Sequence, residues 1–203
     1  DFLTYVNEKI TYPYSMIDKI VPAPSAKVQA YLQKCHFADT ELIQAGRSTY
    51  AIFVNAEEAQ YLVVEDNFPN GRPPLEKAGV IFTDRETVNK VERMKVGTCL
   101  NPLHTTLAVY GCLLGDTLIA DEMKDAELKK LIEHIGYDEG LPVVVNPGVI
   151  NPKAFIDELI SKRLPNPNVP DTPQRIATDT SQKVGVRFGE TIKAYGDKAH
   201  TLE

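Results

Sequence analysis

Residues 91–115, VERMKVGTCLNPLHTTLAVYGCLLG, decide how this chain folds and where its chemistry is to be sought. The apolar side chains recur at helical spacing, which predicts a long helix that is buried along most of its length. Lys95, Asn101 and His104 interrupt the apolar pattern. An amine, an amide and an imidazole that face one point can transfer a proton and hold an alkoxide, as an alcohol–ketone oxidoreductase without a metal requires.

The spacing of these three residues predicts an irregular helix. Asn101 and His104 are three residues apart and share one face, whereas Lys95 precedes His104 by nine residues, about half a turn out of phase. Pro102 has no N–H for the carbonyl one turn earlier, and Gly97 weakens the helix further. We therefore predict a π-bulge or kink that turns Lys95 toward the other two. The alternative is a lysine that extends to solvent, an amide at a kink and a core histidine.

The composition is that of an ordinary soluble globular protein, with 203 residues, 43% hydrophobic and 25% charged, which is enough for one large or two small domains. The net charge of −6 argues against a nucleic-acid partner. No apolar run reaches membrane-spanning length, and no signal peptide is visible. Three widely spaced cysteines favour reduced thiols and a cytoplasmic location. No metal site is predicted, because neither CxxC nor HExxH occurs.

The remaining pattern predicts a mainly helical chain with a small β element. Two strands are expected at residues 50–54 and 60–65, because these are rich in β-branched and aromatic residues. A short helical turn is possible at residues 15–20, and a capping box is expected at residues 83–86. Further helices are predicted at residues 25–35 with Ser25 as N-cap, 118–135 with Gly136 as C-cap, 152–163 with Asn151 as N-cap, from Asp171 or Thr172 onward, and 188–195.

The two ends predict a piece of a larger protein. The chain begins with Asp1, and its last residues, 200–203, resemble the remnant of a cloning site and tag. No GxGxxG motif follows a strand, so the sequence predicts no dinucleotide-binding half. We expect residues 1–203 to form one domain that includes a segment between domains at residues 1–23.

A second group of polar residues lies in RIATDTSQK, residues 175–183. Arg175 and Lys183 are eight residues apart, which places them within about a quarter turn of each other on one helix. Both can donate to substrate hydroxyls or to a carboxylate, and Arg can do so in bidentate fashion. The alternative is a charged surface helix. Asp18, within SMIDKI, is a further candidate; its alternative role is a capping or turn carboxylate.

Taken in order, these motifs resemble the polyol-specific long-chain dehydrogenases, the mannitol dehydrogenase and mannonate oxidoreductase family. The resemblance covers nearly the whole chain, from SMIDKI through EDNF, GRPPLEKAGV and the Lys…Leu-Asn-x-x-His motif to RIATDTSQK. Two departures stand out. The lysine precedes the asparagine by six residues where the family has five, and the chain lacks the tryptophan that members commonly carry before the Glu-Asp pair.

This resemblance implies the C-terminal substrate domain of a two-domain dehydrogenase whose cofactor domain is absent from the chain. NAD or NADP would be bound mainly by an N-terminal Rossmann domain, which would be the partner of this one. The reaction would interconvert a polyol or sugar acid and its ketose without a metal. D-mannonate and D-fructuronate are slightly favoured over mannitol and fructose, because Arg175 and Lys183 could bind a carboxylate.

The resemblance also implies roles for six residues. Lys95 would be the base, because burial in an apolar pocket disfavours the charged form of a lysine. Asn101 would hold the alkoxide, and His104 would orient the substrate hydroxyls. Asp18, Arg175 and Lys183 would bind substrate. The competing hypothesis is a non-catalytic helical binding or dimerisation module, in which these residues need not converge on one cleft.

Overall fold

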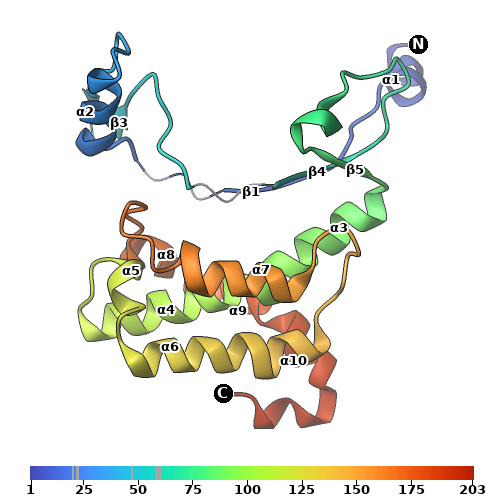
Figure 1. Cartoon of the computed structure of the whole chain (residues 1–203). Coiled ribbons are helices and arrows are strands. Elements are labelled where there is room, and N and C mark those ends of the chain that lie inside the picture. The colour runs from blue at the N-terminus through green and yellow to red at the C-terminus, as the bar shows by residue number, and fades with distance from the viewer. Residues whose placement is uncertain (20, 22, 47, 58–60) are drawn as a thin grey trace.

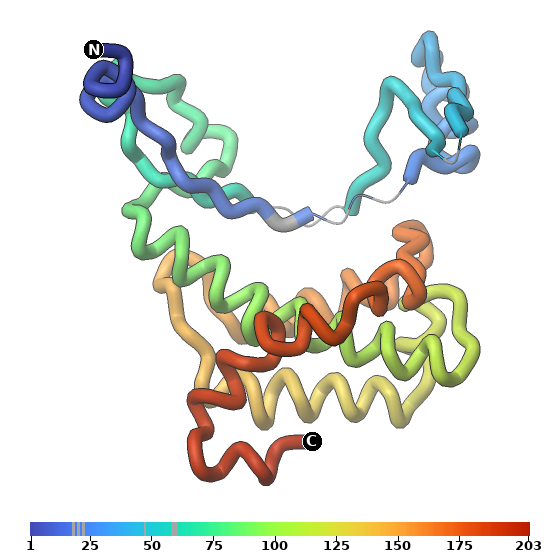
Figure 2. Tube along the Cα trace, turned by 180° about the vertical axis from the view of Figure 1, so that it is seen from behind, coloured from blue at the N-terminus to red at the C-terminus, as the bar shows by residue number. Residues whose placement is uncertain are grey.

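The computed structural model describes residues 1–19, 21, 23–46, 48–57 and 61–203, and it leaves the side chain of Asp18 outside this description. A helical bundle forms one part, and the N-terminal elements lie to one side of it in two separate groups (Figure 1). The same arrangement is visible from behind (Figure 2). The fold class predicted from the sequence, mainly helical with a small β element, is therefore confirmed. No helix among the described residues is long and apolar enough to cross a membrane.

The bundle is built around the helix that carries Asn101 and His104. Its buried face includes Leu103 and Leu107, which pack in one cluster with Ile132, Ile156 and Leu159 from other helices. All five side chains are fully buried, so each contributes roughly 1.5–3 kcal/mol through removal from water. The bundle consists of α3 (Arg85–Met94), η2 (Lys95–Cys99), α4 (Asn101–Leu114), α5 (Ile119–Glu122), α6 (Ala126–Glu133), η3 (His134–Gly140), η4 (Leu141–Val143), α7 (Pro152–Glu158), η5 (Leu159–Arg163), α8 (Pro173–Ala177), α9 (Thr180–Arg187), α10 (Gly189–Tyr195) and η6 (Gly196–Thr201).

The N-terminal part contains two small sheets. In the first, strand order is β1-β4-β5; β1 pairs antiparallel with β4, with Met16 opposite Val63, and β4 pairs parallel with β5. The second is an antiparallel hairpin of β2 and β3. The elements are α1 (Phe2–Lys9), β1 (Ser15–Asp18), α2 (Ala26–Lys34), β2 (Ile43–Ala45), β3 (Ser48–Tyr50), β4 (Tyr61–Glu65), η1 (Leu75–Ala78) and β5 (Ile81–Thr83).

A small interface joins the first sheet to the bundle. Met16 and Val63 from the sheet pack against Val88 and Val91 of α3, and all four side chains are buried. A second link is the buried ion pair of Glu57 with Arg163 at the end of η5, with Nε–Oε2 and Nη2–Oε1 distances of 2.9 and 2.8 Å. These contacts fix β4 and, separately, Glu57 against the bundle.

Two predicted helix starts are confirmed by their caps. The hydroxyl of Ser25 accepts from Val28 N–H at 3.2 Å, and the side chain of Asn151 accepts from Ala154 N–H at 2.9 Å. Each such cap satisfies an N–H that has no partner within the helix.

Five other local predictions were wrong. Residues 15–18 form strand β1 instead of a helical turn, because they pair with β4. The strand expected at 50–54 lies earlier, in β3. Asp84, rather than Thr83, caps α3 by accepting from Thr87 N–H at 2.8 Å. Residues 118–135 are broken between α5 and α6, and Gly136 lies within the π-turn η3 instead of capping a helix.

Candidate active site

The helix that carries the central motif contains the predicted bulge. Residues Lys95–Cys99 form a π-turn, in which the N–H of Leu100 donates to the carbonyl of Lys95 at 3.0 Å. Leu100 has φ −119° and ψ −61°, away from ideal α-helix geometry. Pro102, the second residue of α4, has no N–H, so the carbonyl of Thr98 loses its usual donor and the ladder can widen there. The bulge predicted between Lys95 and Pro102 is therefore confirmed.

Helix α10 packs directly against this bulge. A Cβ at Gly97 would lie 2.9 Å from Cγ of Glu190, so residue 97 has to be glycine for α10 to approach this closely. The carboxylate of Glu190 pairs with Arg93 at 2.6 Å, and the hydroxyl of Thr191 donates to the Gly97 carbonyl at 3.4 Å. The bulge is therefore held from outside by α10 as well as by its own backbone.

His104 contacts a buried carboxylate that the sequence analysis did not place in the site. Its Nε2 lies 2.9 Å from Oδ2 of Asp171, and both side chains are buried. Arg175, one turn further along, pairs with the other oxygen of Asp171 through its Nη2. Burial opposes ionisation of Asp171, but the nearby imidazole of His104, then the guanidinium of Arg175, outweigh it and hold the pKa of Asp171 below its ordinary value. The carboxylate attracts the imidazole at this distance, although Nε2 and Oδ2 are not aligned for a hydrogen bond.

Asn101 lies one turn before His104 on α4, as its spacing predicted. Its amide oxygen is buried and has no hydrogen-bond partner among the described residues. Buried polar atoms without a partner are rare in native proteins, and at a site they mark a position that a ligand can satisfy. The backbone carbonyl of Asn101 accepts from the hydroxyl of Thr105 at 2.7 Å.

Arg175 and Lys183 do not share one helix as predicted. The chain breaks between α8 and α9, where Asp179 takes the left-handed conformation with φ +57°. Arg175 is held on Asp171. Lys183 Nζ donates to the carbonyls of Ile176 and Thr178, where it satisfies the C-terminal end of α8. Of this pair, Arg175 alone is linked to His104, through Asp171.

Lys95 and Asp18 complete the set of predicted site residues. Lys95 is half-buried at the first position of the bulge. Its convergence with Asn101 and His104 on one point stays a prediction. Asp18 ends strand β1, and the predicted role of its side chain falls outside the described part of the structure.

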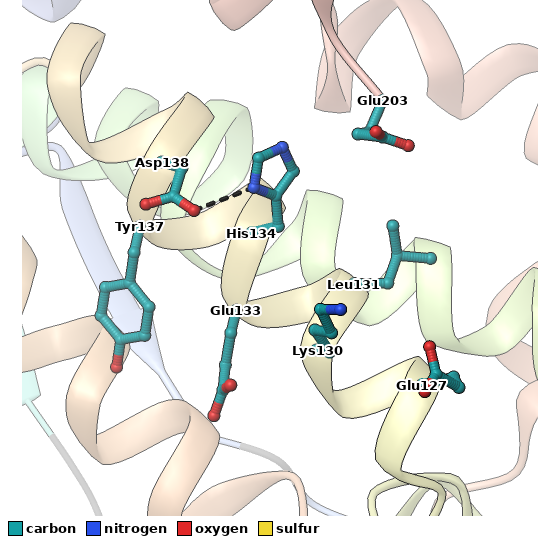
Figure 3. A pocket seen from close by; sticks show the side chains of 8 residues that line it. All are labelled: Glu127, Lys130, Leu131, Glu133, His134, Tyr137, Asp138 and Glu203. Atoms are coloured by element: carbon teal, nitrogen blue, oxygen red, sulfur yellow. Dashed lines mark hydrogen bonds and ion pairs between the residues drawn. The ribbon is translucent and has the colours of Figure 1, made fainter.

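Two cavities lie away from these residues. The larger, of about 500 Å³, is lined by α6 and η3 together with Glu203 (Figure 3). In it, Nδ1 of His134 pairs with Asp138 at 2.8 Å. The second, of about 420 Å³, is mostly apolar and lies between α4, η3 and the C-terminal helices. Neither cavity is lined by Lys95, Asn101 or His104. Within the described residues, no group of three or more His, Cys, Asp or Glu side chains is placed to hold a metal ion.

Three residues near the motif were missed by the sequence analysis. Asp171 was considered only as the start of a helix, although an acid four residues before Arg175 signals a possible pair. Arg187 donates to the hydroxyl of Thr105, and nothing in its sequence context indicates this contact. Glu122 is fully buried and lies directly against Gly111 of α4. Burial, then the nearby Asp116 and Asp171, raises the pKa of Glu122 to about 8.

Comparison with known proteins agrees with this fold. Residues 87–201 match the family model of the mannitol dehydrogenase C-terminal domain. The chain is 60% identical over 201 residues to D-mannonate oxidoreductase from Thermotoga maritima, covering 98% of this chain and 37% of the relative. It is 32% identical over 189 residues to polyol:NADP oxidoreductase from Gluconobacter oxydans, covering 93% of this chain and 36% of that relative.

Two solved structures share the architecture. A D-sorbitol dehydrogenase in its substrate-free form superposes with a TM-score of 0.79 at 31% identity, covering 96% of this chain and 38% of that one. Mannitol 2-dehydrogenase from Pseudomonas fluorescens, in a ternary complex with NAD and D-mannitol, gives a TM-score of 0.71 at 26% identity, covering 95% and 36%. The chain thus spans somewhat more than a third of the length of these relatives. The matched model covers more than half of the chain, which therefore belongs to the mannitol dehydrogenase C-terminal domain family.

Proposed function

We propose that this chain is the substrate-binding and catalytic domain of a metal-independent, NAD(P)-linked oxidoreductase that interconverts a polyol or sugar acid and its ketose. D-mannonate and D-fructuronate are the favoured pair, and mannitol and fructose are the runner-up. The observation that carries the proposal is the π-turn at Lys95–Cys99, directly before Asn101 and the His104–Asp171 pair. The 60% identity to a D-mannonate oxidoreductase supports the choice of substrate.

The proposed chemistry of this chain concerns the proton and the oxygen of the reacting alcohol. Lys95 accepts the hydroxyl proton, and the amide of Asn101 donates to the oxygen as it becomes an alkoxide. Asp171 faces Nε2 of His104, and a carboxylate in that position favours the tautomer with hydrogen on Nε2. Nδ1 is then the ring nitrogen that meets a substrate hydroxyl. The π-turn supports this assignment because it changes the phase of Lys95 relative to Asn101 by about one residue.

The chain itself does not fit a nicotinamide dinucleotide. Its parallel strands β4 and β5 are connected by residues 66–80, whose only helical element is the short 3-10 turn η1. This connection lacks the glycine-rich turn and long helix whose N-terminus binds a pyrophosphate. We propose that NAD or NADP, which accepts the hydride, is bound mainly by a Rossmann domain of the full-length protein. Calorimetry with this chain alone should detect no saturable NAD binding.

The first experiment uses the full-length protein. Nicotinamide reduction is followed with D-mannonate, mannitol, altronate and arabinitol for the wild type, Lys95→Ala and the matched surface variant Lys90→Ala. Lys90 lies on α3 and pairs with the exposed Glu86 at 2.7 Å. The variant Lys90→Ala should therefore leave turnover unchanged. We expect Lys95→Ala to lower kcat roughly 10²–10⁴-fold, the usual contribution of a general base.

Three outcomes are informative. Turnover of one substrate that is lost in Lys95→Ala supports both the reaction and the base. Turnover that survives in Lys95→Ala would mean that another group accepts the proton. No turnover of any of the four substrates by the wild type would favour a non-catalytic helical binding or dimerisation module.

A further inference from the structure

Arg187, the last residue of α9, differs from the other arginines that the structure describes. Each of the others forms an ion pair with a carboxylate at 2.9 Å or less, in the pairs Arg72–Asp66, Arg85–Glu65, Arg93–Glu190, Arg163–Glu57 and Arg175–Asp171. Arg187 has no carboxylate within 4.0 Å in the described part of the chain, although it is half-buried. Burial alone lowers its pKa, since no acid compensates the charge.

The position of Arg187 is set by the helix that carries the proposed catalytic residues. Its Nη1 donates to the hydroxyl of Thr105, and that hydroxyl donates in turn to the carbonyl of Asn101. Thr105 is four residues beyond Asn101, which is ~6 Å along α4. A distance of this order separates the two ends of a sugar-acid chain. The guanidinium is therefore held beside the turn of α4 that follows Asn101, through the Thr105 hydroxyl.

Arg187 also has donors to spare. A guanidinium carries five N–H groups, and the contact with Thr105 is the one hydrogen bond that Arg187 makes within the described residues. Its remaining nitrogens are not among the fully buried atoms without a partner, so they keep some contact with solvent. A half-buried cation with free donors matches the geometry of a carboxylate, which guanidinium binds with two parallel hydrogen bonds.

We propose that Arg187 binds the carboxylate of a sugar-acid substrate and so distinguishes sugar acids from uncharged polyols. This inference rests on the proposed function and deepens it. The two residues that the sequence suggested for a carboxylate are already engaged, because Arg175 pairs with Asp171 and Lys183 donates to backbone carbonyls. Among the described residues, Arg187 contacts Thr105 on this turn of α4 and has no acid of its own.

The test compares a sugar acid with a polyol in the full-length protein. The steady-state kinetics of D-mannonate and mannitol are measured for the wild type, Arg187→Gln, Arg187→Lys and the control Arg72→Gln, which removes a guanidinium from an ion pair far from α4. We expect the ratio of kcat/KM for mannonate to that for mannitol to fall roughly 10–100-fold in Arg187→Gln, chiefly through the KM for mannonate. Arg187→Lys should restore part of the ratio, and Arg72→Gln should leave it unchanged.

A binding measurement decides the proposal if turnover is absent. Calorimetric titration with D-mannonate should show weaker binding to Arg187→Gln than to the wild type, with an unchanged urea midpoint as evidence of intact folding. Equal losses for mannonate and mannitol, or equal mannonate binding by both proteins, would overturn the role of Arg187. So would a wild type that binds no mannonate. Turnover of mannitol but not of mannonate by the wild type would also overturn it, while leaving the oxidoreductase proposal standing.

Discussion

The helical bundle and the N-terminal part of the chain, residues 1–83, differ in how far their apolar side chains are exposed. The main core cluster lies wholly between Met94 and Ile176. Helices α1 and α2 and strands β2 and β3 contain no buried residue among those that the structure describes. The large apolar side chains of these elements and of the segment between α2 and β2 are exposed instead, with Phe2 81%, Tyr31 67% and Phe37 63% accessible. The bundle thus has a core of its own, whereas the N-terminal part has an exposed apolar surface of the kind that another protein part usually covers.

This difference indicates that the bundle is the part of the chain that can be stable alone. Apolar surface of this extent on a single domain usually marks an interface. We propose that the cofactor-binding part of the full-length protein covers it, since the chain corresponds to little more than a third of its relatives. The free energy of folding of the isolated chain should therefore reside almost entirely in the bundle.

The sharpest test of that comparison uses one residue type in the two regions. Ile156→Ala removes a fully buried side chain from the bundle core and should destabilise the isolated chain by about 4 kcal/mol, because it leaves a cavity. The matched change Ile52→Ala, at a side chain that is 71% exposed, should alter stability by less than ~0.5 kcal/mol. Urea unfolding followed by circular dichroism measures both. Similar losses of unfolding free energy at the two positions would show that the N-terminal part contributes to stability as much as the bundle does.

A second variant tests the junction between the two regions. Arg163→Gln removes the guanidinium that faces the buried carboxylate of Glu57, and it should cost about 3 kcal/mol locally. Amide hydrogen exchange should accelerate in β4 much more than in α4. The double variant Glu57→Gln with Arg163→Met removes both charges and should recover part of the loss. Uniform acceleration across the chain would show that the two regions unfold together.

The bundle should also carry a pH dependence near neutral pH, which Glu122 causes. Glu122 has its pKa raised to about 8 in the fold from an ordinary 4.5, so it binds a proton in the folded state that the unfolded chain releases. Its contribution is fully present below about pH 4.5 and is lost as pH rises through 8. Relative to Glu122→Gln, the wild type should lose about 2 kcal/mol between pH 5 and pH 7. Denaturation at several pH values measures this difference, and parallel curves would contradict it.

The smallest effect is expected on the exposed apolar surface. Phe37→Ser should change the stability of the isolated chain by less than ~0.5 kcal/mol, because this ring is already largely in water. In the full-length protein the same change should lower the thermal midpoint measurably, since the ring would there be covered. An unchanged midpoint in the full-length protein would remove this residue from the proposed interface.

The sequence predicted best those features that depend on near neighbours. The caps at Ser25 and Asn151 are single hydrogen bonds to residues three positions away. The bulge was predictable because Pro102 and Gly97 weaken the ladder and because the lysine is one position out of phase with the family motif. Such signals are local and are visible in the sequence.

The features that were missed depend on contacts between distant segments. Strand β1 exists because it pairs with β4, and nothing in residues 15–18 alone distinguishes it from a turn. Asp171 meets His104 only once α8 is packed on α4. Arg187 likewise reaches Thr105 through helix packing. The break at Asp179 depends on a left-handed backbone conformation, which aspartate tolerates but which an aspartate in the sequence does not by itself predict.

The π-turn at Lys95–Cys99 also sets the rotation of α3 about its axis relative to α4. Each residue of a helix adds ~100° of rotation, so removal of one residue from this turn would rotate α3 about its axis relative to α4. The first sheet packs on α3 through Val88 and Val91. The sheet would therefore move with the helix. Deletion of Val96 would therefore reorient α3 and the N-terminal part of the chain relative to α4, and it would disturb the packing of Met94 in the core.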